Sequence, residues 1–203
     1  MDNKYKIVCI GIDQSYENTG ISITADNNIL KVNSLYLGGI KNNSDKRRYL
    51  KNTLLKIINN IKPKCKNIVC VIERIRLRSQ GFINIDYIKS IGALNSVIVD
   101  VMSEFNIQVY SVDTRCWKAQ VVGTCKPLNN RFGVPPEKWP TVQWCISKGF
   151  KQSILKDVTG TRKEKGTFSI KDKKYMYNND AADSSAISMF WFVGDKEKLK
   201  VEK

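Results

Sequence analysis

Hydrophobic runs separated by polar segments predict several strands in this chain. The runs Ile7–Asp13, Ile68–Glu73 and Ile107–Val112 are almost continuously apolar, as is typical of strands buried on both faces. Two more strands are expected at Gly20–Ala25 and Ile29–Leu37, on either side of an Asp-Asn-Asn turn that favours a hairpin. The chain is therefore expected to open with three strands, two of which are joined by a tight turn.

Helical periodicity predicts the elements between and after these strands. Ser44-Asp45 is expected to cap a helix that runs to about Ile61. A longer helix is expected from about Ile85 to Phe105. Its middle is apolar on more than one side, so it is either fully buried or packs against both the sheet and a partner. Shorter helices are predicted at 114–122, 137–148 and 180–193.

This order of elements predicts an α/β fold, with a mixed five-stranded sheet and flanking helices. The hairpin strands should be antiparallel and the later strands parallel. A chain of 203 residues suits one domain with an ordinary core, so we expect a single domain over residues 1–203. The segment 149–178 is the least core-like part and is rich in lysine. It is expected to be a basic insertion with a small hairpin around Thr167–Tyr177.

Composition narrows the class of protein. Hydrophobic residues make up 42% of the chain, which is typical of a globular fold, and no apolar stretch approaches the ~20 residues that span a bilayer. The start of the chain lacks the layout of a signal peptide. We therefore expect no membrane association and a cytoplasmic location. The Lys-, Asn- and Ile-rich usage is compatible with a bacterial, phage or mobile-element genome, hence with a bacterial cell or a phage-infected host.

The charge and the absence of histidine limit the chemistry. A net charge of +15 indicates a polyanionic partner, and nucleic acid is the leading one because the positive charge is clustered. The chain has six cysteines but no C-x-x-C pair, so we expect reduced thiols and neither disulfides nor a zinc site. Any acid–base or metal chemistry must then use carboxylates, lysines, tyrosines or water.

Four carboxylates stand where such chemistry is expected. Asp13 and Glu73 each end an apolar strand. Because active sites of α/β sheets lie at the carboxyl ends of parallel strands, these two should be neighbours. Asp180 and Asp183 are three residues apart at the start of a predicted helix, so they share one face. The alternative for this pair is ordinary capping, with Asp180 as the N-cap and Asp183 favouring the helix dipole.

Converging acids repel one another unless cations are bound. Ligation by oxygen alone suits Mg²⁺ or Mn²⁺. Two such ions, held about 4 Å apart, clamp the attacking and leaving oxygens of a phosphodiester, and this reaction needs no histidine. The four carboxylates are therefore candidate ligands for a phosphodiesterase site.

The residues around these carboxylates resemble a known family. The segments G-I-D-Q-S-x-x-N-T-G, V-I-E, W-K-x-x-V-V-G and D-A-A-D-S-S-A-I look like the motifs of the RuvC-type Holliday-junction resolvases, within the ribonuclease H/retroviral integrase superfamily. They occur in the family's order and span Ile7 to about Phe192, although 123–178 is poorly matched. The resemblance implies a ribonuclease H-like sheet in a RuvC-like nuclease domain, as a phage or mobile-element version.

By this resemblance, the four carboxylates would be both catalytic residues and ligands of two Mg²⁺ ions, with Mn²⁺ as a substitute. Lys118 matches a catalytic basic residue near the scissile phosphate, and Lys138 resembles a second such position. The implied activity is that of a crossover junction endodeoxyribonuclease, which resolves four-way DNA junctions by paired phosphodiester hydrolysis in recombination and repair. The implied assembly is a homodimer through the helix 85–105.

The sequence departs from the family pattern in places. Asp13 is followed by Gln14-Ser15, where family members commonly have Pro-Gly, and Asp183 stands where some members have histidine. The aromatic residue that wedges into the junction matches Arg76 here, and Phe82 is the aromatic that could take its place.

Arginines follow the second carboxylate at alternate positions. In an extended segment they would share one side and could grip backbone phosphates, whereas the alternative is a solvated loop edge. The predicted DNA-binding residues are therefore Arg74, Arg76, Arg78, Phe82, Lys118 and Lys138.

Other functions remain as alternatives. A broader branched-DNA nuclease that cuts forks and flaps would use the same carboxylates, and the altered wedge position favours it. A non-cleaving module that binds branched DNA is disfavoured because all four carboxylates are present. An ATPase of the actin and sugar-kinase type shares the strand–turn pattern of the first motif, but it would need a duplicated domain, and this sequence has no internal repeat.

Overall fold

The computed structural model describes residues 4–75, 85–123, 137–150, 155–157, 167–170 and 173–202. The elements, in chain order, are β1 (Tyr5–Asp13), β2 (Asn18–Ala25), β3 (Asn28–Tyr36), α1 (Asn43–Ile61), β4 (Cys65–Glu73), α2 (Ile85–Glu104), β5 (Gln108–Val112), α3 (Thr114–Trp117), α4 (Trp139–Ser147), β6 (Leu155–Asp157), β7 (Thr167–Ile170), β8 (Lys173–Tyr177), α6 (Asn179–Val193) and β9 (Lys200–Val201). Short turns of 3₁₀ or π helix are η1 (Lys62–Lys64), η2 (Lys118–Val122) and η3 (Lys196–Lys198).

The main sheet has the strand order β3-β2-β1-β4-β5-β9. β1 pairs in parallel with β4, and β4 with β5, whereas the pairs β1–β2 and β2–β3 are antiparallel. Asp26 and Asn27, which both have positive φ, form the tight turn between β2 and β3. The predicted mixed α/β sheet is therefore confirmed.

The prediction of five strands is wrong, because the main sheet of the described residues has six. The additional strand, β9, pairs antiparallel with β5 through Tyr110 and Ser111. β9 contains only Lys200 and Val201, and both are exposed. Two exposed residues carry no periodicity from which a strand could be predicted, and only their pairing with the edge of β5 defines one.

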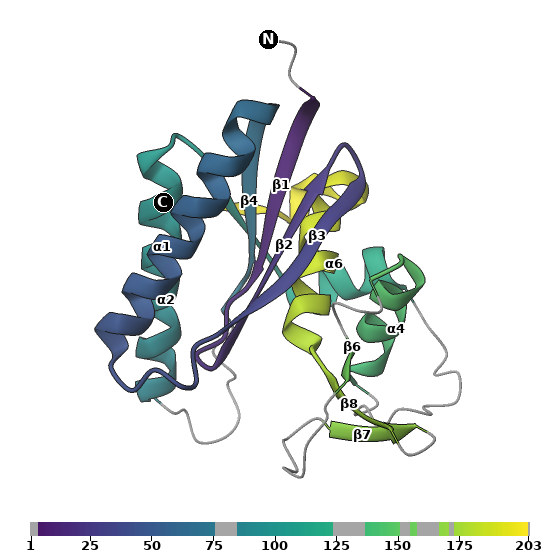
Figure 1. Ribbon diagram of the computed structural model, residues 1–203. Helices are drawn as coiled ribbons and strands as arrows, with labels where there is room; N and C mark the ends of the chain where they lie inside the picture. Colours follow the sequence, from purple (N-terminus) through teal and green to yellow (C-terminus); the bar gives the residue numbers. More distant parts are fainter. Residues whose placement is uncertain are drawn as a thin grey trace.

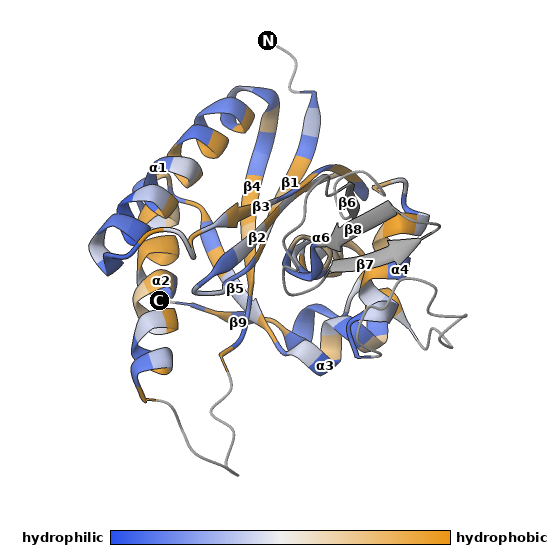
Figure 2. Ribbon diagram, turned by 60° about the horizontal axis from the view of Figure 1, so that its bottom comes forward, coloured by the Kyte–Doolittle hydropathy of each residue, from blue (hydrophilic) through white to orange (hydrophobic). Residues whose placement is uncertain are grey.

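Helices cover both faces of the sheet (Figure 1). α1 and α2 lie on one face, where Leu54 and Ile98 share a hydrophobic core with Ile12. α6 lies on the other face, in a core that also includes residues of α3 and α4, and there Phe190 joins Val71. The strands in the middle of the sheet are mostly hydrophobic (Figure 2), as expected for strands that are covered on both faces.

α6 approaches the sheet more closely than most side chains would allow. A Cβ on Gly11 of β1 would come within 2.3 Å of the Ser184 carbonyl oxygen, and a Cβ on Gly20 of β2 within 1.8 Å of the Asp180 carbonyl oxygen. The Ser22 hydroxyl of β2 donates a hydrogen bond to the Ser184 carbonyl at 2.7 Å. Glycines on the strands and serines on the helix therefore hold the start of α6 directly over β2.

The predicted helices are confirmed, with small differences at their ends. α1 begins at Asn43 because Asn42 is its N-cap, and the Asn42 side chain accepts a hydrogen bond from the Ser44 amide at 2.9 Å. The predicted helix 114–122 is capped by Asp113 as expected, but from Lys118 it continues as the π turn η2. The cysteines in the described part of the chain are all free thiols.

Between α4 and α6, short strands form a second sheet with the order β6-β8-β7. β7 and β8 are antiparallel, with Thr167 opposite Met176, which confirms the predicted hairpin in the basic segment. β8 leads directly into α6. Among the described helices, none is long and apolar enough to cross a membrane.

Candidate active site at the carboxyl end of the sheet

Asp13 and Glu73 end the two parallel strands in the middle of the sheet. β1 and β4 pair in register up to the residues just before them, so the two carboxylates lie side by side, as predicted. The pKa of Asp13 is raised well above its ordinary value, first by burial and then by the charges of Asp183, Glu73 and Asp180. A hydrogen bond between Asp13 and Glu73 adds to this increase. Burial and the neighbouring charges therefore favour the protonated form of Asp13 in the metal-free protein.

α6 brings Asp180 and Asp183 to the same edge of the sheet. Its N-cap is Asn178, whose side chain accepts a hydrogen bond from the Ala181 amide at 3.0 Å, so the alternative in which Asp180 caps the helix is wrong. Asp183 is only 6% exposed, and burial raises its pKa to about 7. A helix dipole alone would lower this pKa, so burial dominates. We call Asp13, Glu73, Asp180 and Asp183 the carboxylate cluster.

Polar side chains that the sequence pattern did not predict as site residues hold the cluster in place. Asn18, at the start of β2, donates a hydrogen bond to Asp180 at 2.7 Å. Burial raises the pKa of Asp180, and this hydrogen bond opposes the increase. Thr114 donates to the Glu73 carboxylate, and the Gln14 side chain donates to the Glu73 carbonyl oxygen. Only their positions in the sequence indicated that they belong to the site: Gln14 and Asn18 lie within the first quoted motif, and Thr114 follows the end of a strand.

Lys118 and Lys138, both predicted from the sequence, reach the same cluster. Their positive charges lower the pKa of Asp183 against the larger effect of burial, which places both lysines near that carboxylate. Lys138 also lowers the pKa of Asp180. Lys118 is the first residue of η2, and its ammonium lies 5.2 Å from the ring centroid of the buried Trp117. π turns of this kind are frequent at functional sites.

Tyr87 is a further residue at this site. It lies in the first turn of α2 and is 53% exposed. The pKa of its phenol is raised by partial burial and then by the charges of Asp13, Asp180 and Glu73, while Lys138 opposes the increase. α2 therefore begins beside the cluster. An exposed tyrosine at the start of a helix carries no sequence signal for such a position.

The donor set of the cluster fits a hard divalent cation, although its side chains do not stand as a finished metal site. Within the described ranges, no group of three or more Asp, Glu or Cys side chains is arranged to hold an ion. Burial is the first cause that raises the pKa values of Asp13, Asp180 and Asp183, so their ionised forms are costly unless a cation is bound. Buried carboxylate oxygens are ligands that suit Mg²⁺.

The predicted strip of arginines is only partly described. The Arg74 guanidinium donates to the carbonyl oxygens of Ser111 at 3.3 Å and Lys198 at 3.5 Å, so it ties the end of β4 to β5 and η3. Its contact with phosphate stays a prediction. The remaining arginines of the strip and the candidate wedge residue lie outside the described residues: Arg76, Arg78 and Phe82.

No protein-family model matches the sequence, and no curated protein matches it. Solved structures do match. RuvC from Thermus thermophilus gives a TM-score of 0.57 at 12% identity, over 96% of this chain and 99% of that one. RuvC from T. thermophilus in complex with a Holliday junction substrate gives 0.55 at 11% identity, over 90% of each chain. The yeast mitochondrial Holliday junction resolvase Ydc2 gives 0.51 at 14% identity, over 94% of this chain and 79% of that one.

The chain is an α/β protein whose mixed sheet has helices on both faces. Its candidate site lies at the carboxyl ends of the middle strands β1 and β4. More specifically, the chain has the fold of the RuvC-type resolvases. The fold implied by the motifs is thereby confirmed.

Proposed function

We propose that this protein is a metal-dependent, structure-specific DNA endonuclease that cuts four-way junctions by hydrolysing phosphodiester bonds. The observation that carries the proposal is the carboxylate cluster, which lies at the carboxyl end of a sheet with the RuvC-type fold and has Lys118 and Lys138 beside it. The net charge of +15 supports a polyanionic substrate. The proposal treats residues 1–203 as one nuclease domain with a basic insertion.

The residues of the chain would divide the reaction among them. The carboxylate cluster would hold two Mg²⁺ ions, for which Mn²⁺ could substitute. When bound, such ions activate a water and stabilise the leaving oxygen of the phosphodiester. Lys118 and Lys138 place positive charge beside the cluster, where it would attract the scissile phosphate. Asn18 and Thr114 hold the Asp180 and Glu73 carboxylates in fixed orientations.

The cleavage test compares end-labelled four-way junction, fork, flap and linear duplex in the presence of Mg²⁺. Paired symmetric nicks in the junction alone are the expected result. Cutting of all branched forms would instead indicate the broader branched-DNA nuclease, and binding without cutting would indicate a binding module. Asp13→Asn should abolish cleavage but keep junction binding. The exposed Asp100→Asn on α2 is the matched control and should cut at the wild-type rate.

The proposal includes a homodimer through α2, because a four-way junction has two equivalent strands to cut. Five residues of α2 form a stripe next to the buried face of the helix. They are three or four positions apart, which is the spacing of residues in helix–helix contacts: Ile85, Ile88, Gly92, Asn95 and Val99. Ile85 is 61% exposed. A Cβ on Gly92 would meet open space. These features suit a second copy of α2.

Gly92 makes the dimer testable without disturbing the fold. Gly92→Arg puts a long charged side chain into open space and removes a helix-destabilising glycine, so the monomer should stay folded. In sedimentation equilibrium the wild type should be a dimer and Gly92→Arg a monomer with unchanged circular dichroism. Gly92→Ala, which adds only a methyl group, should remain a dimer. A monomeric wild type at micromolar concentration would remove the dimer from the proposal.

A further inference from the structure

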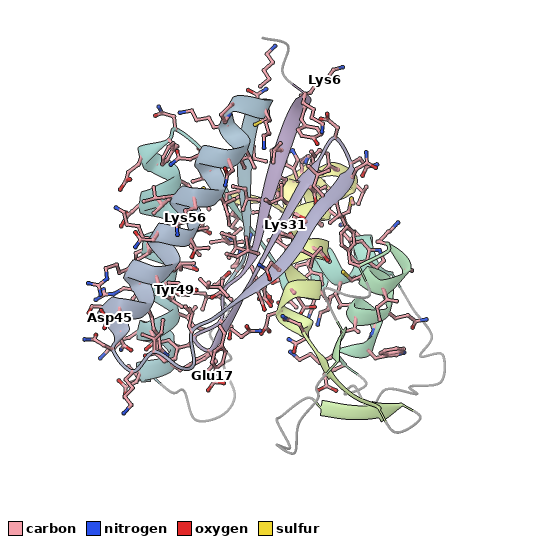
Figure 3. All side chains as sticks on the ribbon, in the orientation of Figure 1. Lys6, Glu17, Lys31, Asp45, Tyr49 and Lys56 are labelled. Carbon is pink, nitrogen blue, oxygen red and sulfur yellow. The ribbon has the colours of Figure 1, made fainter. Side chains whose placement is uncertain are left out.

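A pocket lies between the N-terminal parts of α1 and α2, beside the end of β1. Its volume is about 170 Å³, which is ample because ~10–15 Å³ suffices for one water. Its polar lining consists of Tyr16, Asn43, Lys46, Arg47, Lys89 and Ser90. Figure 3 shows Glu17, next to Tyr16 in sequence, and Asp45, in the first turn of α1, at the same end of the molecule.

The pocket lining is basic and contains no acid. Lys46, Arg47 and Lys89 contribute to its wall. Two acids are next to lining residues in sequence: Asp45 pairs instead with Arg48 at 2.9 Å, and Glu17 lies near Asp180, whose pKa its charge raises. In the part of the chain that the structure describes, none of the three basic side chains takes part in an ion pair. The pocket therefore carries uncompensated positive charge.

Lys46 makes this pocket different from an ordinary basic surface. It is only 5% exposed, although a lysine is almost never fully buried unless it is paired. Its ammonium donates to the Tyr16 carbonyl oxygen at 3.3 Å and lies 3.6 Å from the centroid of the Tyr16 ring. An ammonium has three donors, and this hydrogen bond uses one of them. An anion in the pocket would supply the missing acceptors and the opposite charge.

Helix α1 adds to the same electrostatic preference. This helix of 19 residues begins at the pocket, because its first residue, Asn43, lines it, whereas α2 contributes residues of its second and third turns. The N-terminal end of a helix carries a partial positive charge and free N–H donors, which favour phosphate. The one aromatic ring in the lining, Tyr16, is already covered by the Lys46 ammonium, so a phosphate fits the pocket better than a nucleobase.

Short stretches of chain connect the pocket to the carboxylate cluster. Tyr16 follows Asp13 by three residues, and Lys89 lies two residues after Tyr87, whose pKa responds to the charges of the cluster. We propose that this pocket binds a backbone phosphate of the DNA strand whose scissile phosphodiester lies at the carboxylate cluster. The inference rests on the proposed nuclease function and adds a second anchor for the same strand, which would fix the register of the cut.

The first test of this pocket needs no DNA. Arg47 and Lys89 are exposed, so the double variant Arg47→Ala/Lys89→Ala should fold normally. Lys6→Ala/Lys56→Ala removes the same charge from exposed positions outside the pocket (Figure 3) and is the matched control. Titration with inorganic phosphate should shift the backbone amide NMR signals of the pocket lining in the wild type and the control. These shifts should disappear in the pocket variant, and their absence from the wild type would overturn the proposal.

The second test assigns the phosphate to DNA. Junction binding is measured against salt concentration without Mg²⁺, in an Asp13→Asn background. The pocket variant should bind roughly tenfold more weakly than the control, because it cannot form the charge-assisted hydrogen bonds to phosphate. Its slope of log affinity against log salt should also fall by about 1 for each phosphate that the variant no longer neutralises. Equal slopes for both variants would overturn the assignment to DNA while leaving the nuclease function intact. Failure of every variant to bind junctions would overturn both.

Discussion

Replacing Asp183 by Asn should stabilise the metal-free protein at pH 8. Asp183 is 6% exposed, and burial raises its pKa from the ordinary 3.8 to about 7, against the opposing charges of Lys118 and Lys138. At pH 8 the folded protein therefore holds a buried, ionised carboxylate, whereas the unfolded chain holds a solvated one. Asparagine has nearly the same shape without the charge, so the substitution removes this penalty.

The magnitude follows from the linkage between protonation and folding. Between the unfolded and the folded pKa, the native state holds a proton that the unfolded chain has released, so the free energy of unfolding falls as the pH rises. Each unit of pKa corresponds to about 1.4 kcal/mol, so above pH 7 the ionised Asp183 costs the folded state on the order of 4 kcal/mol. We expect Asp183→Asn to gain about 4 kcal/mol at pH 8 but only about 1 kcal/mol at pH 4.5.

Urea unfolding in EDTA, at both pH values, measures this difference. The denaturation midpoint should rise in the variant at pH 8 while the m-value stays the same, because the surface exposed on unfolding hardly changes. Asp100→Asn removes the same charge from an exposed position on α2 and should leave the midpoint unchanged. A gain that is absent at pH 8, or equally large at both pH values, would refute the reasoning that the buried charge of Asp183 destabilises the metal-free fold.

Further predictions concern the groups around the cluster. Gly20→Ala places a Cβ within 1.8 Å of the Asp180 carbonyl oxygen, so it should lower the unfolding free energy by about 2–4 kcal/mol in urea and sharply reduce junction cleavage. Asn18→Ala removes the hydrogen bond that lowers the pKa of Asp180, so the acid limb of the pH–rate profile should move to higher pH. Thr114→Val frees the Glu73 carboxylate and should weaken Mg²⁺ binding by about 10-fold or more in calorimetry. Mg²⁺ should raise the melting temperature of the wild type at pH 8, and chelation should reverse this.

The central part of the site was predictable because two independent patterns meet there. Apolar runs that end in a carboxylate predict buried strands, and parallel pairing of those strands then forces Asp13 and Glu73 together. Helical spacing places Asp180 and Asp183 on one face. The ordered motifs supplied the remaining step, since periodicity does not say that the start of this helix lies over the ends of those strands.

The surroundings of the cluster were not predictable because they depend on contacts between distant segments. Asn18 and Asp180 are 162 residues apart, and Thr114 and Glu73 are 41 residues apart. Each is a single polar residue with an ordinary local role in a turn or at a helix start, so no periodic pattern distinguishes it. Tyr87 likewise becomes a site residue only because α2 begins beside the cluster.

The packing of α6 explains how the fold tolerates the cost of this cluster. A penalty on the order of 4 kcal/mol is a large share of the 5–15 kcal/mol that stabilises a typical domain. Residues 181–190 are all buried, and Ser188 hydrogen-bonds with Ser22 and Thr24 of β2, one to two turns beyond the cluster. These contacts hold the helix even when its first turn carries repelling charges. A divalent ion would then remove the repulsion without having to order the helix, because the sheet already positions it.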